Sequence, residues 1–452
     1  MPELTYLEAI TSAMSEEMER DERVFLIGED VGGYGGAFKT SYGLIDRFGA
    51  ERVIDTPISE IAIIGAASGA ALMGMRPIAE MQFIDFITCG YDILVNFAAM
   101  NSYLFGRACP IVVRGPAGGG THGGPYHSLN PEAMFMNRPG LKIVAPGTAY
   151  DAKGLLKAAI RDDNPVLFIE HKYLYRRIKE NLPNDDYVVP IGKANVRRRG
   201  KDLSIITWGA MIYLAEEAAN ELAKDGVSAE IIDLRSILPF DEEAILESVA
   251  KTNRVMILHE APLTGGAGAE FAARIAEKAF EYLDAPIKRV GALDVPTPYS
   301  PPLEAAALPD KARVLAAARE LMAFSECGGW AAALRSEKRR LGRRTPRPPH
   351  TTAAPDRPPP RRSRSRPPAT ATCGTAPRGA AWRGVRRSVR ASRAPAPPRA
   401  ARRSRRTTRP CSAPPPRAAR RHRPSSTCAL PRDSSGRARS GSAARAGVHQ
   451  SP

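Results

Sequence analysis

The first 324 residues of this 452-residue chain contain little cysteine and no long hydrophobic run. Only Cys89 and Cys109 lie there, without a CxxC spacing or a Cys/His cluster, so we expect neither a zinc site nor a disulfide. Scattered thiols are typical of a reducing compartment. No segment has the apolar length that a bilayer requires, and the N-terminus lacks a basic segment followed by an apolar core. We therefore predict a cytoplasmic protein without membrane spans.

The residues from 325 onward lack Ile, Asn, Tyr, Phe and Met altogether. They contain 31 Arg and one Lys against four acidic residues, and 20 of the 40 prolines. This tail carries a net charge of +28, whereas residues 1–324 carry −11, so the overall +17 does not by itself indicate a nucleic-acid binder. Because the tail lacks the residues that build a core, we predict that it is disordered.

Two origins of this basic tail are open. Out-of-frame translation of a GC-rich gene yields such an Arg/Pro/Ala/Ser vocabulary, and we interpret residues 325–452 as a frameshift or read-through product. The alternative is a segment that binds nucleic acid, for which salt-sensitive RNA binding should vanish when the tail is removed. An intact mass near that of residues 1–324 would support the first origin, and a full-length mass would contradict it.

Residues 1–324 alternate short apolar segments with amphipathic ones. This alternation predicts an α/β fold with parallel sheets covered on both faces. A connector at 183–192 divides it into two parallel-sheet domains, residues 1–185 and 186–324. The predicted strands are 24–28, 52–55, 78–83, 110–115, 140–146, 166–170, 204–208, 229–234, 254–258 and 287–290, and the predicted helices are 5–20, 61–72, 91–103, 150–161, 212–224, 241–250 and 268–282.

The segment DTPISEIAIIGAASGAALMGMRPIAEMQFIDF, residues 55–86, places Glu60 between a predicted strand and a helix rich in small residues. In parallel α/β sheets, ligands usually bind in the loop that follows a strand. Glu60 could be a first-turn glutamate favoured by the helix dipole, or part of a buried salt bridge. It could also be a desolvated carboxyl group with a raised pKa that shares a proton with a ligand nitrogen. The apolar surround favours the ligand interpretation.

Two glycine-rich loops follow predicted strands. The loop 116–128 contains His122 and His127, which are candidates for proton transfer because histidine titrates near neutral pH. We assign a function to His127, whereas a hydrogen bond to nearby backbone explains His122 equally well. The loop 29–36 has neither a P-loop lysine nor the GxGxxG order, so it is a structural turn or a loop at a substrate channel or subunit contact.

A series of motifs runs in order through residues 4–324: LTYLEAI, FLIGEDVGGYGGAFKTSYGL, RVIDTPISE, AEMQFIDF, RGPAGGGTHGGPYHS, PEAMF, PGLKIVAPGTAYDAKGLLKAAIRDDNPVLFIEHKYLY, EIIDLRSILPFD and DVPTPYSPPLE. This series resembles the beta subunit of the decarboxylating component of 2-oxo acid dehydrogenase complexes. These are thiamine diphosphate enzymes of the transketolase-like superfamily. The resemblance implies a transketolase-like pyrimidine-binding domain at 1–185 and a transketolase C-terminal-like domain at 186–324.

The resemblance implies roles for four residues. Glu60 matches the glutamate that hydrogen-bonds a pyrimidine nitrogen of thiamine diphosphate and favours the tautomer that deprotonates the thiazolium C2. Phe86 matches the aromatic residue that stacks on the pyrimidine, although core packing also explains it, and Gln82 matches a polar residue near the cofactor and substrate. His127 matches the histidine that assists acyl transfer to the lipoyl group. It is followed by Ser-Leu-Asn, where Ser-Gln-Ser or similar is commoner in the family.

A structural potassium ion is a further implication of the resemblance. The matching positions, which act largely through backbone oxygens, are Ile111, Ala159, Ile160, Asp162 and Asn164. Asp162 could instead simply cap the preceding helix, and both interpretations stay open.

The chain lacks the GDG motif followed at a distance by Asn that holds magnesium and the diphosphate in this superfamily. The resemblance therefore implies an alpha subunit that binds this end of the cofactor, an active site at the subunit interface, and an assembly of two alpha and two beta chains. It also implies docking of the dihydrolipoamide acyltransferase core, with its lipoyl domain, near the end of the second domain.

The implied reaction is oxidative decarboxylation of a 2-oxo acid with acyl transfer to lipoamide. AEMQF is closer to branched-chain enzymes, but pyruvate and acetoin enzymes share most of these motifs. One alternative is half of a split transketolase, which would act on sugar phosphates without lipoamide. An alternative of a different class is nucleic-acid binding through the tail.

Overall fold

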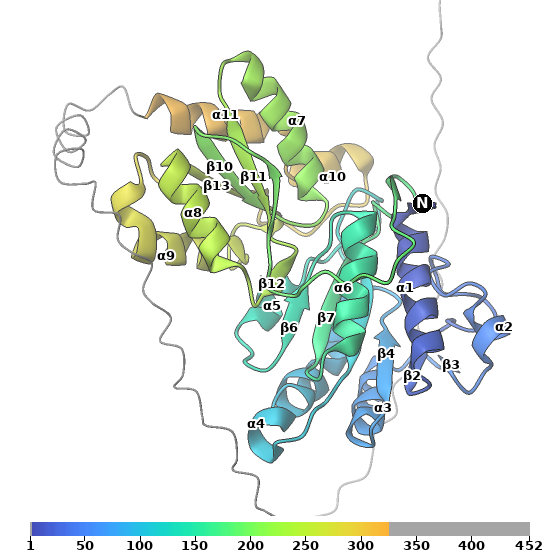
Figure 1. Cartoon of the computed structure of the whole chain (residues 1–452). Helices are drawn as coiled ribbons and strands as arrows, with labels where there is room; N and C mark the ends of the chain where they lie inside the picture. Colours follow the sequence, from blue (N-terminus) through green and yellow to red (C-terminus); the bar gives the residue numbers. More distant parts are fainter. Residues whose placement is uncertain (1, 325–452) are drawn as a thin grey trace, which may run out of the picture. The chain divides into compact units, whose positions relative to one another are not determined.

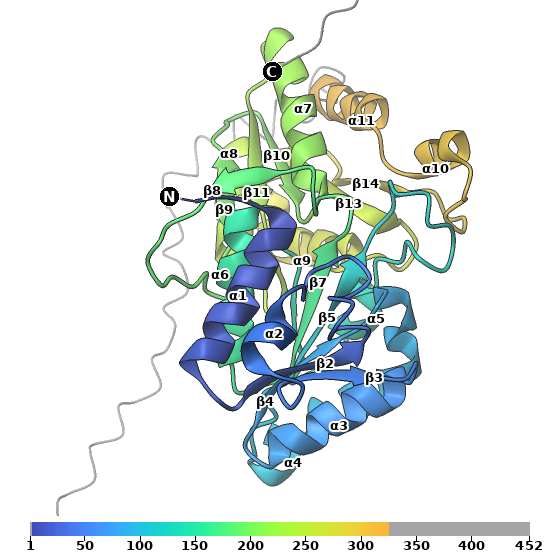
Figure 2. The same ribbon diagram turned by 90° about the vertical axis from the view of Figure 1, so that its right-hand side faces the viewer.

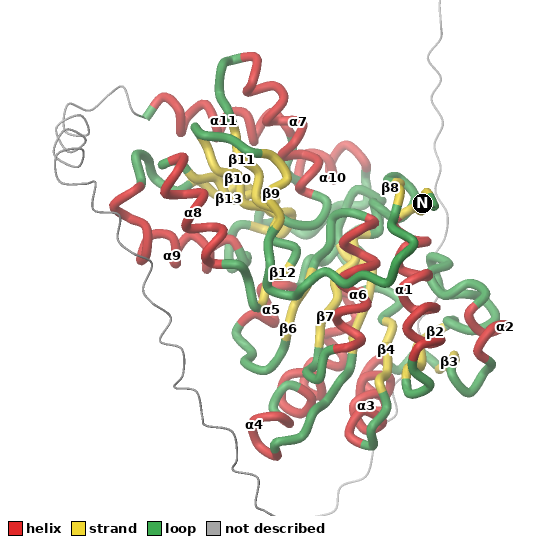
Figure 3. The backbone as a smooth tube through the Cα atoms, in the orientation of Figure 1, coloured by secondary structure: helices red, strands yellow, loops and turns green. Residues whose placement is uncertain are grey.

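The computed structural model describes residues 2–324, and the predictions for residues 325–452 lie outside this range. Its first sheet has seven strands in the order β12-β6-β7-β5-β4-β2-β3 (Figures 1 and 3). All neighbouring strands are parallel except β12, which runs antiparallel to β6. The strands are β2 (Val24–Glu29), β3 (Val53–Thr56), β4 (Arg76–Glu80), β5 (Val112–Ala117), β6 (Lys142–Val144), β7 (Val166–His171) and β12 (Ser236–Leu238).

Helices cover both faces of this sheet. Successive residues of a strand point to opposite faces, so neighbouring residues belong to different cores. Leu26 belongs to the core beneath α1 (Tyr6–Arg20) and α6 (Ala149–Arg161). Its neighbour Ile27 belongs to the core on the other face, with α3 (Glu60–Leu72). Figure 2 shows β2 and β3 between α1 and α3. The predicted doubly covered α/β sheet is therefore confirmed.

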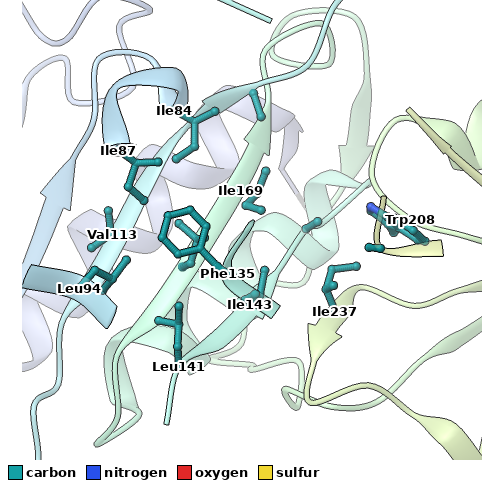
Figure 4. Packing of buried hydrophobic residues seen from close by; sticks show 14 of the residues in the cluster. Ile84, Ile87, Leu94, Val113, Phe135, Leu141, Ile143, Ile169, Trp208 and Ile237 are labelled. Atoms are coloured by element: carbon teal, nitrogen blue, oxygen red, sulfur yellow. The ribbon is translucent and has the colours of Figure 1, made fainter. Parts of the chain in front are cut away.

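The core on the α3 face continues into the segments that follow β4 and β5. Phe135 of the short helix α5 (Glu132–Met136) is fully buried there. Figure 4 shows its ring among side chains of the sheet and of the segment after β4, including Ile84, Ile87, Leu94, Val113, Leu141, Ile143 and Ile169. This packing holds the backbone of the segments that follow β4 and β5.

The opening helix begins with a capping box. The Thr5 hydroxyl accepts a hydrogen bond from the Glu8 backbone N–H, and the Glu8 carboxylate accepts one from the Thr5 N–H at 2.8 Å. The apolar residues whose spacing predicted this helix, Leu7, Ile10, Met14 and Met18, are all buried. Just before it, β1 (Glu3–Thr5) pairs antiparallel with β8 (Lys179–Asn181).

The second sheet has five strands in the order β14-β13-β10-β11-β9. Only β9, at its edge, is antiparallel to its neighbour. Helices α7 and α11 pack on one face, and α8 and α9 on the other. The bounds are β9 (Asn195–Arg198), β10 (Leu203–Thr207), β11 (Ala229–Asp233), β13 (Val255–Pro262), β14 (Lys288–Ala292), α7 (Met211–Lys224), α8 (Glu242–Thr252), α9 (Gly268–Ala279) and α11 (Lys311–Ala323).

The predicted helix 91–103 is helical but not one continuous α-helix. It contains a π-helical turn η2 (Ile93–Ala98) and a short α4 (Asn101–Phe105), and a 3₁₀ turn η1 (Ile84–Gly90) precedes it. A Cβ added to Gly90 would lie 2.4 Å from Cδ1 of Ile64, so the backbone approaches α3 too closely for a larger residue. The predicted helix 268–282 ends in a 3₁₀ turn η3 (Phe280–Tyr282), and short helices that were not predicted include α2 (Leu44–Phe48) and α10 (Pro301–Ala307).

Strand β12 comes from the second half of the chain but completes the first sheet. It follows Arg235, which has a positive φ of 58° and turns the backbone away from β11. Arg235 Nη1 also donates a hydrogen bond to Asp151 of α6 at 2.9 Å. Residues 2–324 accordingly fall within one compact unit. None of the helices in this range has the length and apolarity to cross a membrane.

Candidate active site

The carboxyl ends of the parallel strands in the first sheet bring most predicted site residues to one edge. Glu29 ends β2, Glu60 follows β3, and Gln82 follows β4. The loop with His127 follows β5. Because these strands run in the same direction, their loops share the edge where such sheets bind ligands.

Glu60 is the first residue of α3, where the helix dipole favours a negative charge. Within residues 2–324 its side chain makes no hydrogen bond and no ion pair, so the salt-bridge interpretation finds no partner there. Glu60 is only partly buried, and the flanking Ile58 and Ile61 are 81% and 54% exposed. The flanking side chains are thus apolar, but Glu60 is open to solvent rather than desolvated as expected.

A second carboxyl group, Glu29, lies close enough to Glu60 to feel its charge, and the sequence analysis did not identify it. It is 5% exposed, and its Oε1 has no hydrogen-bond partner among the described residues. Burial, and then the negative charge of Glu60, raise the pKa of the Glu29 carboxyl, while a hydrogen bond from the Ser59 backbone opposes them. Its position as the last residue of a buried parallel strand was the available signal.

Phe86 and His127 lie against each other although the chain separates them by 41 positions. The ring centroids of Phe86 and His127 are 5.9 Å apart with an interplanar angle of 82°. Phe83 is closer to the His127 ring, with centroids 4.2 Å apart and an angle of 69°. Both phenylalanines therefore present edge-to-face contacts that restrict the imidazole ring.

The hydrogen bonding of His127 indicates which ring nitrogen is free. Its Nδ1 lies 3.2 Å from the carbonyl oxygen of Gly123. A carbonyl oxygen only accepts, so the neutral ring carries its proton on Nδ1 and the lone pair on Nε2. His127 is partly buried, and its Nε2 remains available to a ligand.

The other predicted histidine, His122, has a partner that was not expected. Its Nδ1 lies 2.6 Å from Oε2 of Glu304, and its backbone N–H donates to the same oxygen at 3.2 Å. Glu304 belongs to α10 of the second domain and is 1% exposed. His122 is therefore tied to a carboxylate across the domain contact rather than to nearby backbone.

Gln82 lies beside the glycine-rich loop 29–36. Its Nε2 donates to Oδ2 of Asp30 at 3.4 Å. The loop itself is held at its base, because the Gly32 N–H donates to Oδ1 of Asp55 at 2.6 Å. A Cβ on Gly32 would lie 2.4 Å from Oδ2 of that carboxylate. These contacts favour the structural-turn interpretation of the loop.

The five positions matched to a potassium site surround the end of α6. The Asp162 N–H donates to the Ala159 carbonyl as a C-cap, and the Asp162 carboxylate forms an ion pair with Lys142. The carbonyls of Ile160 and Asp162 both accept from Arg76 Nη1 at 3.0 Å. The Ile111 carbonyl accepts from the Val166 N–H at 2.9 Å, and the Asn164 N–H donates to the Asp162 carboxylate at 2.9 Å. Asp162 therefore does cap the helix, while its carbonyl stays within this group of backbone oxygens.

No group of three or more His, Cys, Asp or Glu side chains in residues 2–324 has the arrangement of a metal site. The two cysteines of this range, Cys89 and Cys109, are free thiols.

Two family models match the chain: "Transketolase, pyrimidine binding domain" over residues 2–177 and "Transketolase, C-terminal domain" over residues 192–314. Among solved structures, a split-gene transketolase described as an inactive beta4 tetramer superimposes with a TM-score of 0.60 at 23% identity. It covers 72% of this chain and 99% of that one. At this identity the likeness shows the fold alone.

Curated relatives are more similar. The 2-oxoisovalerate dehydrogenase subunit beta of Bacillus subtilis is 53% identical over 327 residues, which cover 72% of this chain and 100% of that protein. The pyruvate dehydrogenase E1 component subunit beta of the same organism is 43% identical over 326 residues, with the same coverage. A mitochondrial 2-oxoisovalerate dehydrogenase subunit beta 2 of Arabidopsis thaliana is 44% identical over 319 residues, covering 70% of this chain and 88% of that protein.

The fold and the edge site define a transketolase-like α/β protein, as the sequence predicted. The relatives that match over most of their own length identify the family within this class. The chain belongs to the family of beta subunits of thiamine diphosphate-dependent pyruvate and branched-chain 2-oxo acid dehydrogenases.

Proposed function

We propose that this chain acts with an alpha subunit to decarboxylate a 2-oxo acid oxidatively and to transfer the acyl group to lipoamide. The observation that carries the proposal is the Glu60 carboxylate. It has no partner in the described chain and lies at the N-terminus of α3, on the edge that also holds Phe86 and His127. The match to the whole length of a dehydrogenase beta subunit, over 72% of this chain, supports the same reaction.

Thiamine diphosphate fits the residues at this edge. When bound, the cofactor supplies a carbon nucleophile and an electron sink for decarboxylation. The unpartnered Glu60 carboxyl is suited to hold a proton against a pyrimidine nitrogen, and the unsatisfied Oε1 of Glu29 adds a second acid beside it. Phe86 would stack on the pyrimidine, and Gln82 would bind polar atoms of the cofactor or substrate.

His127 would donate a proton during acyl transfer. Opening the lipoyl disulfide leaves a thiolate sulfur that must be protonated. The Nε2 of His127 is the ring nitrogen not engaged by the Gly123 carbonyl, and histidine exchanges protons near neutral pH. In its protonated form, His127 can therefore donate from Nε2 to the sulfur.

An alpha subunit completes this site in our proposal. The described chain leaves Ile58 and Ile61, which flank Glu60 in the sequence, exposed. A partner that covers them would exclude water from Glu60 and would hold magnesium and the diphosphate. We propose two alpha and two beta chains, with the acyltransferase core and its lipoyl domain docking near the end of the second domain.

A branched-chain 2-oxo acid is the substrate that we propose. Within one organism, Bacillus subtilis, the chain is 53% identical to the 2-oxoisovalerate subunit and 43% identical to the pyruvate subunit. The AEMQF motif agrees with this preference.

Co-expression with an alpha subunit tests the reaction and the substrate together. The purified complex would be assayed with thiamine diphosphate and magnesium on branched-chain 2-oxo acids, pyruvate, acetoin and sugar phosphates. We expect decarboxylation that requires both chains and is fastest with a branched-chain acid. Turnover of sugar phosphates without any 2-oxo acid activity would favour the split-transketolase alternative instead.

Glu60→Gln tests the role of the carboxylate. Glutamine keeps the side-chain shape but cannot share a proton with the pyrimidine, so decarboxylation should fall by at least about 100-fold. Alpha-subunit binding, measured by copurification, should be unchanged. Glu51→Gln, a change on the exposed surface between α2 and β3, is the matched control. Wild-type turnover by Glu60→Gln would refute the assigned role.

Potassium binding at the end of α6 is part of the proposal. Each carbonyl oxygen has two lone pairs, so the carbonyls of Ile160 and Asp162 can accept from Arg76 and still offer a lone pair to a cation. Ile111, Ala159 and Asn164 would supply the remaining backbone oxygens. Replacing potassium with sodium should then lower the melting temperature, and identical melting curves in the two salts would contradict the site.

Two more sequence predictions belong to this proposal. The domain limits 1–185 and 186–324 would be tested by limited proteolysis in the connector. The cytoplasmic location would be tested by fractionation of cells that express the protein.

A further inference from the structure

The loop that carries His127 has little structure of its own. It runs from Gly118 to Asn130 between β5 and α5, and the Gly118 N–H donates to the Leu129 carbonyl at 3.1 Å, which closes its base. Gly118, Gly120 and Gly124 have positive φ angles, a conformation that costs glycine little. With so few side chains to pack, the position of His127 depends on what holds the loop backbone.

Three carboxylates hold that backbone, and none was identified in the sequence as part of the site. Glu260, at the end of β13, accepts from the Gly119 N–H at 2.6 Å. Glu304 accepts from the Gly120 N–H at 2.9 Å. Asp85, in η1, accepts through Oδ1 from the Ser128 N–H at 3.2 Å and from the Leu129 N–H at 3.1 Å. The first two fix the start of the loop, and Asp85 fixes its end.

Asp85 is the anchor that binds the backbone directly after His127. The two N–H groups that it binds belong to the residues directly after His127, and the residue after Asp85 is Phe86, whose ring contacts the imidazole edge to face. Asp85 thus connects the backbone on both sides of the Phe86–His127 contact. Burial raises the pKa of the Asp85 carboxyl, opposed by the Leu129 N–H, and its Oδ2 is buried without a hydrogen-bond partner among the described residues. Burying a carboxyl oxygen without a hydrogen-bond partner costs stability, so its presence here indicates a role beyond packing.

We infer that Asp85 is a positioning residue for acyl transfer, which holds the His127 imidazole at the edge where the lipoyl group arrives. The inference rests on the proposed function. Asp85 acts through the Ser128 and Leu129 N–H groups and the contact between Phe86 and His127, and it touches neither substrate nor cofactor. Its loss should therefore displace His127 while leaving Glu60 in place at the start of α3.

The test compares two reactions of the full-chain complex with its alpha subunit. Decarboxylation is measured with ferricyanide as electron acceptor, which needs no lipoyl group, and acyl transfer is measured with a lipoyl domain. The ratio of transfer to decarboxylation should fall about 100-fold in Asp85→Ala, since a displacement near 1 Å can have that effect. Because both rates come from one preparation, a loss of folded protein cancels in the ratio.

Two matched variants sharpen the comparison. Asp85→Asn keeps a carbonyl oxygen that can accept from both N–H groups, so its ratio should stay within about threefold of wild type. Asp92→Ala removes a nearby carboxylate that is bonded to Asn96 and not to the loop, and it should leave the ratio unchanged. If Asp92→Ala lowers the ratio as much as Asp85→Ala does, the inference is wrong.

A double-mutant cycle separates positioning from a general effect. In a His127→Ala background, Asp85→Ala should lower acyl transfer no further, because its effect passes through the histidine. Additive losses, or a parallel loss of both reactions in the single variant, would overturn the inference. Failure of the wild-type complex to acylate the lipoyl domain would instead overturn the proposed function.

Discussion

Glu132 shows at the scale of one residue how burial makes stability depend on pH. It lies in α5, is 3% exposed, and accepts a hydrogen bond from Nε1 of Trp208 at 3.3 Å. Burial raises the pKa of the Glu132 carboxyl from 4.5 to about 6, against the opposing hydrogen bonds. The folded state therefore binds this proton more tightly than the unfolded state does, and the resulting stabilisation is lost as the pH rises from 4.5 through 6.

The prediction is a pH-dependent difference between wild type and Glu132→Gln. Between pH 4.5 and pH 7 the unfolding free energy of the wild type should fall by about 2 kcal/mol relative to the variant. Glutamine keeps a carbonyl acceptor for Trp208 but does not titrate. Urea unfolding at several pH values measures the difference, and parallel stability profiles for the two proteins would contradict it.

The residues of the site differ in how far sequence could reveal them. Glu60 and His127 lie in loops after predicted strands, and their types suit proton transfer, so pattern and resemblance were enough. Glu29 and Asp85 read locally as the end of a strand and as one acid in an apolar segment. Their significance lies in the partners that face them, Glu60 and the Ser128 backbone, and those partners are brought near only by the fold.

At the scale of elements, three strands of the first sheet are joined by a buried ion network. Arg114 of β5 is fully buried, pairs with Glu80 of β4, and donates two hydrogen bonds to Glu170 of β7, at 2.5 and 2.7 Å. The Tyr175 hydroxyl donates to Glu170 at 2.5 Å and completes the network. Removing one partner of such a network leaves buried charge without compensation.

Arg114→Met should therefore lower the unfolding free energy by about 3–5 kcal/mol. Arg319→Met, the same substitution in an exposed pair with Asp225, should leave it nearly unchanged. Chemical denaturation of the two variants provides the comparison. An equal loss in both would show that the buried network contributes nothing particular.

Elements with a strong repeat were predicted well, and elements set by tertiary contact were not. The helices α1, α6 and α7 carry apolar residues at helical spacing, and each lies within two residues of its predicted bounds. The segment after β4 buries Ile84, Ile87, Leu94 and Val95 whichever helical hydrogen-bond pattern it adopts, so its apolar residues did not reveal the 3₁₀ and π turns.

At the scale of the whole molecule, polar contacts bind the two domains to each other. Glu260 and Glu304 of the second domain hold the His127 loop of the first, and Arg235 pairs with Asp151. Trp208 lies at the same contact, bonded to Glu132 and stacked on His259 with ring centroids 5.6 Å apart. The first domain therefore carries the proposed catalytic groups Glu60 and His127, while the second holds the loop of His127 in place.

We accordingly predict that the two domains unfold together. Trp208 is the only tryptophan of residues 2–324, so a variant with Trp330→Phe and Trp382→Phe reports the domain contact by fluorescence. Its fluorescence and far-ultraviolet circular dichroism should show coincident denaturation curves, as in a single cooperative transition. A fluorescence change that clearly precedes the loss of secondary structure would show that the domains separate first.

The strand β12 has a consequence for any attempt to divide the chain. A fragment that ends near residue 185 would lose β12, and β6 would become an open edge with unpaired N–H and C=O groups beside the apolar Ile143 and Val144. Exposed edges of this kind pair with other copies and promote aggregation. The edge strand of the first sheet therefore comes from the second half of the chain. A soluble fragment that contains this sheet has to extend at least through Leu238.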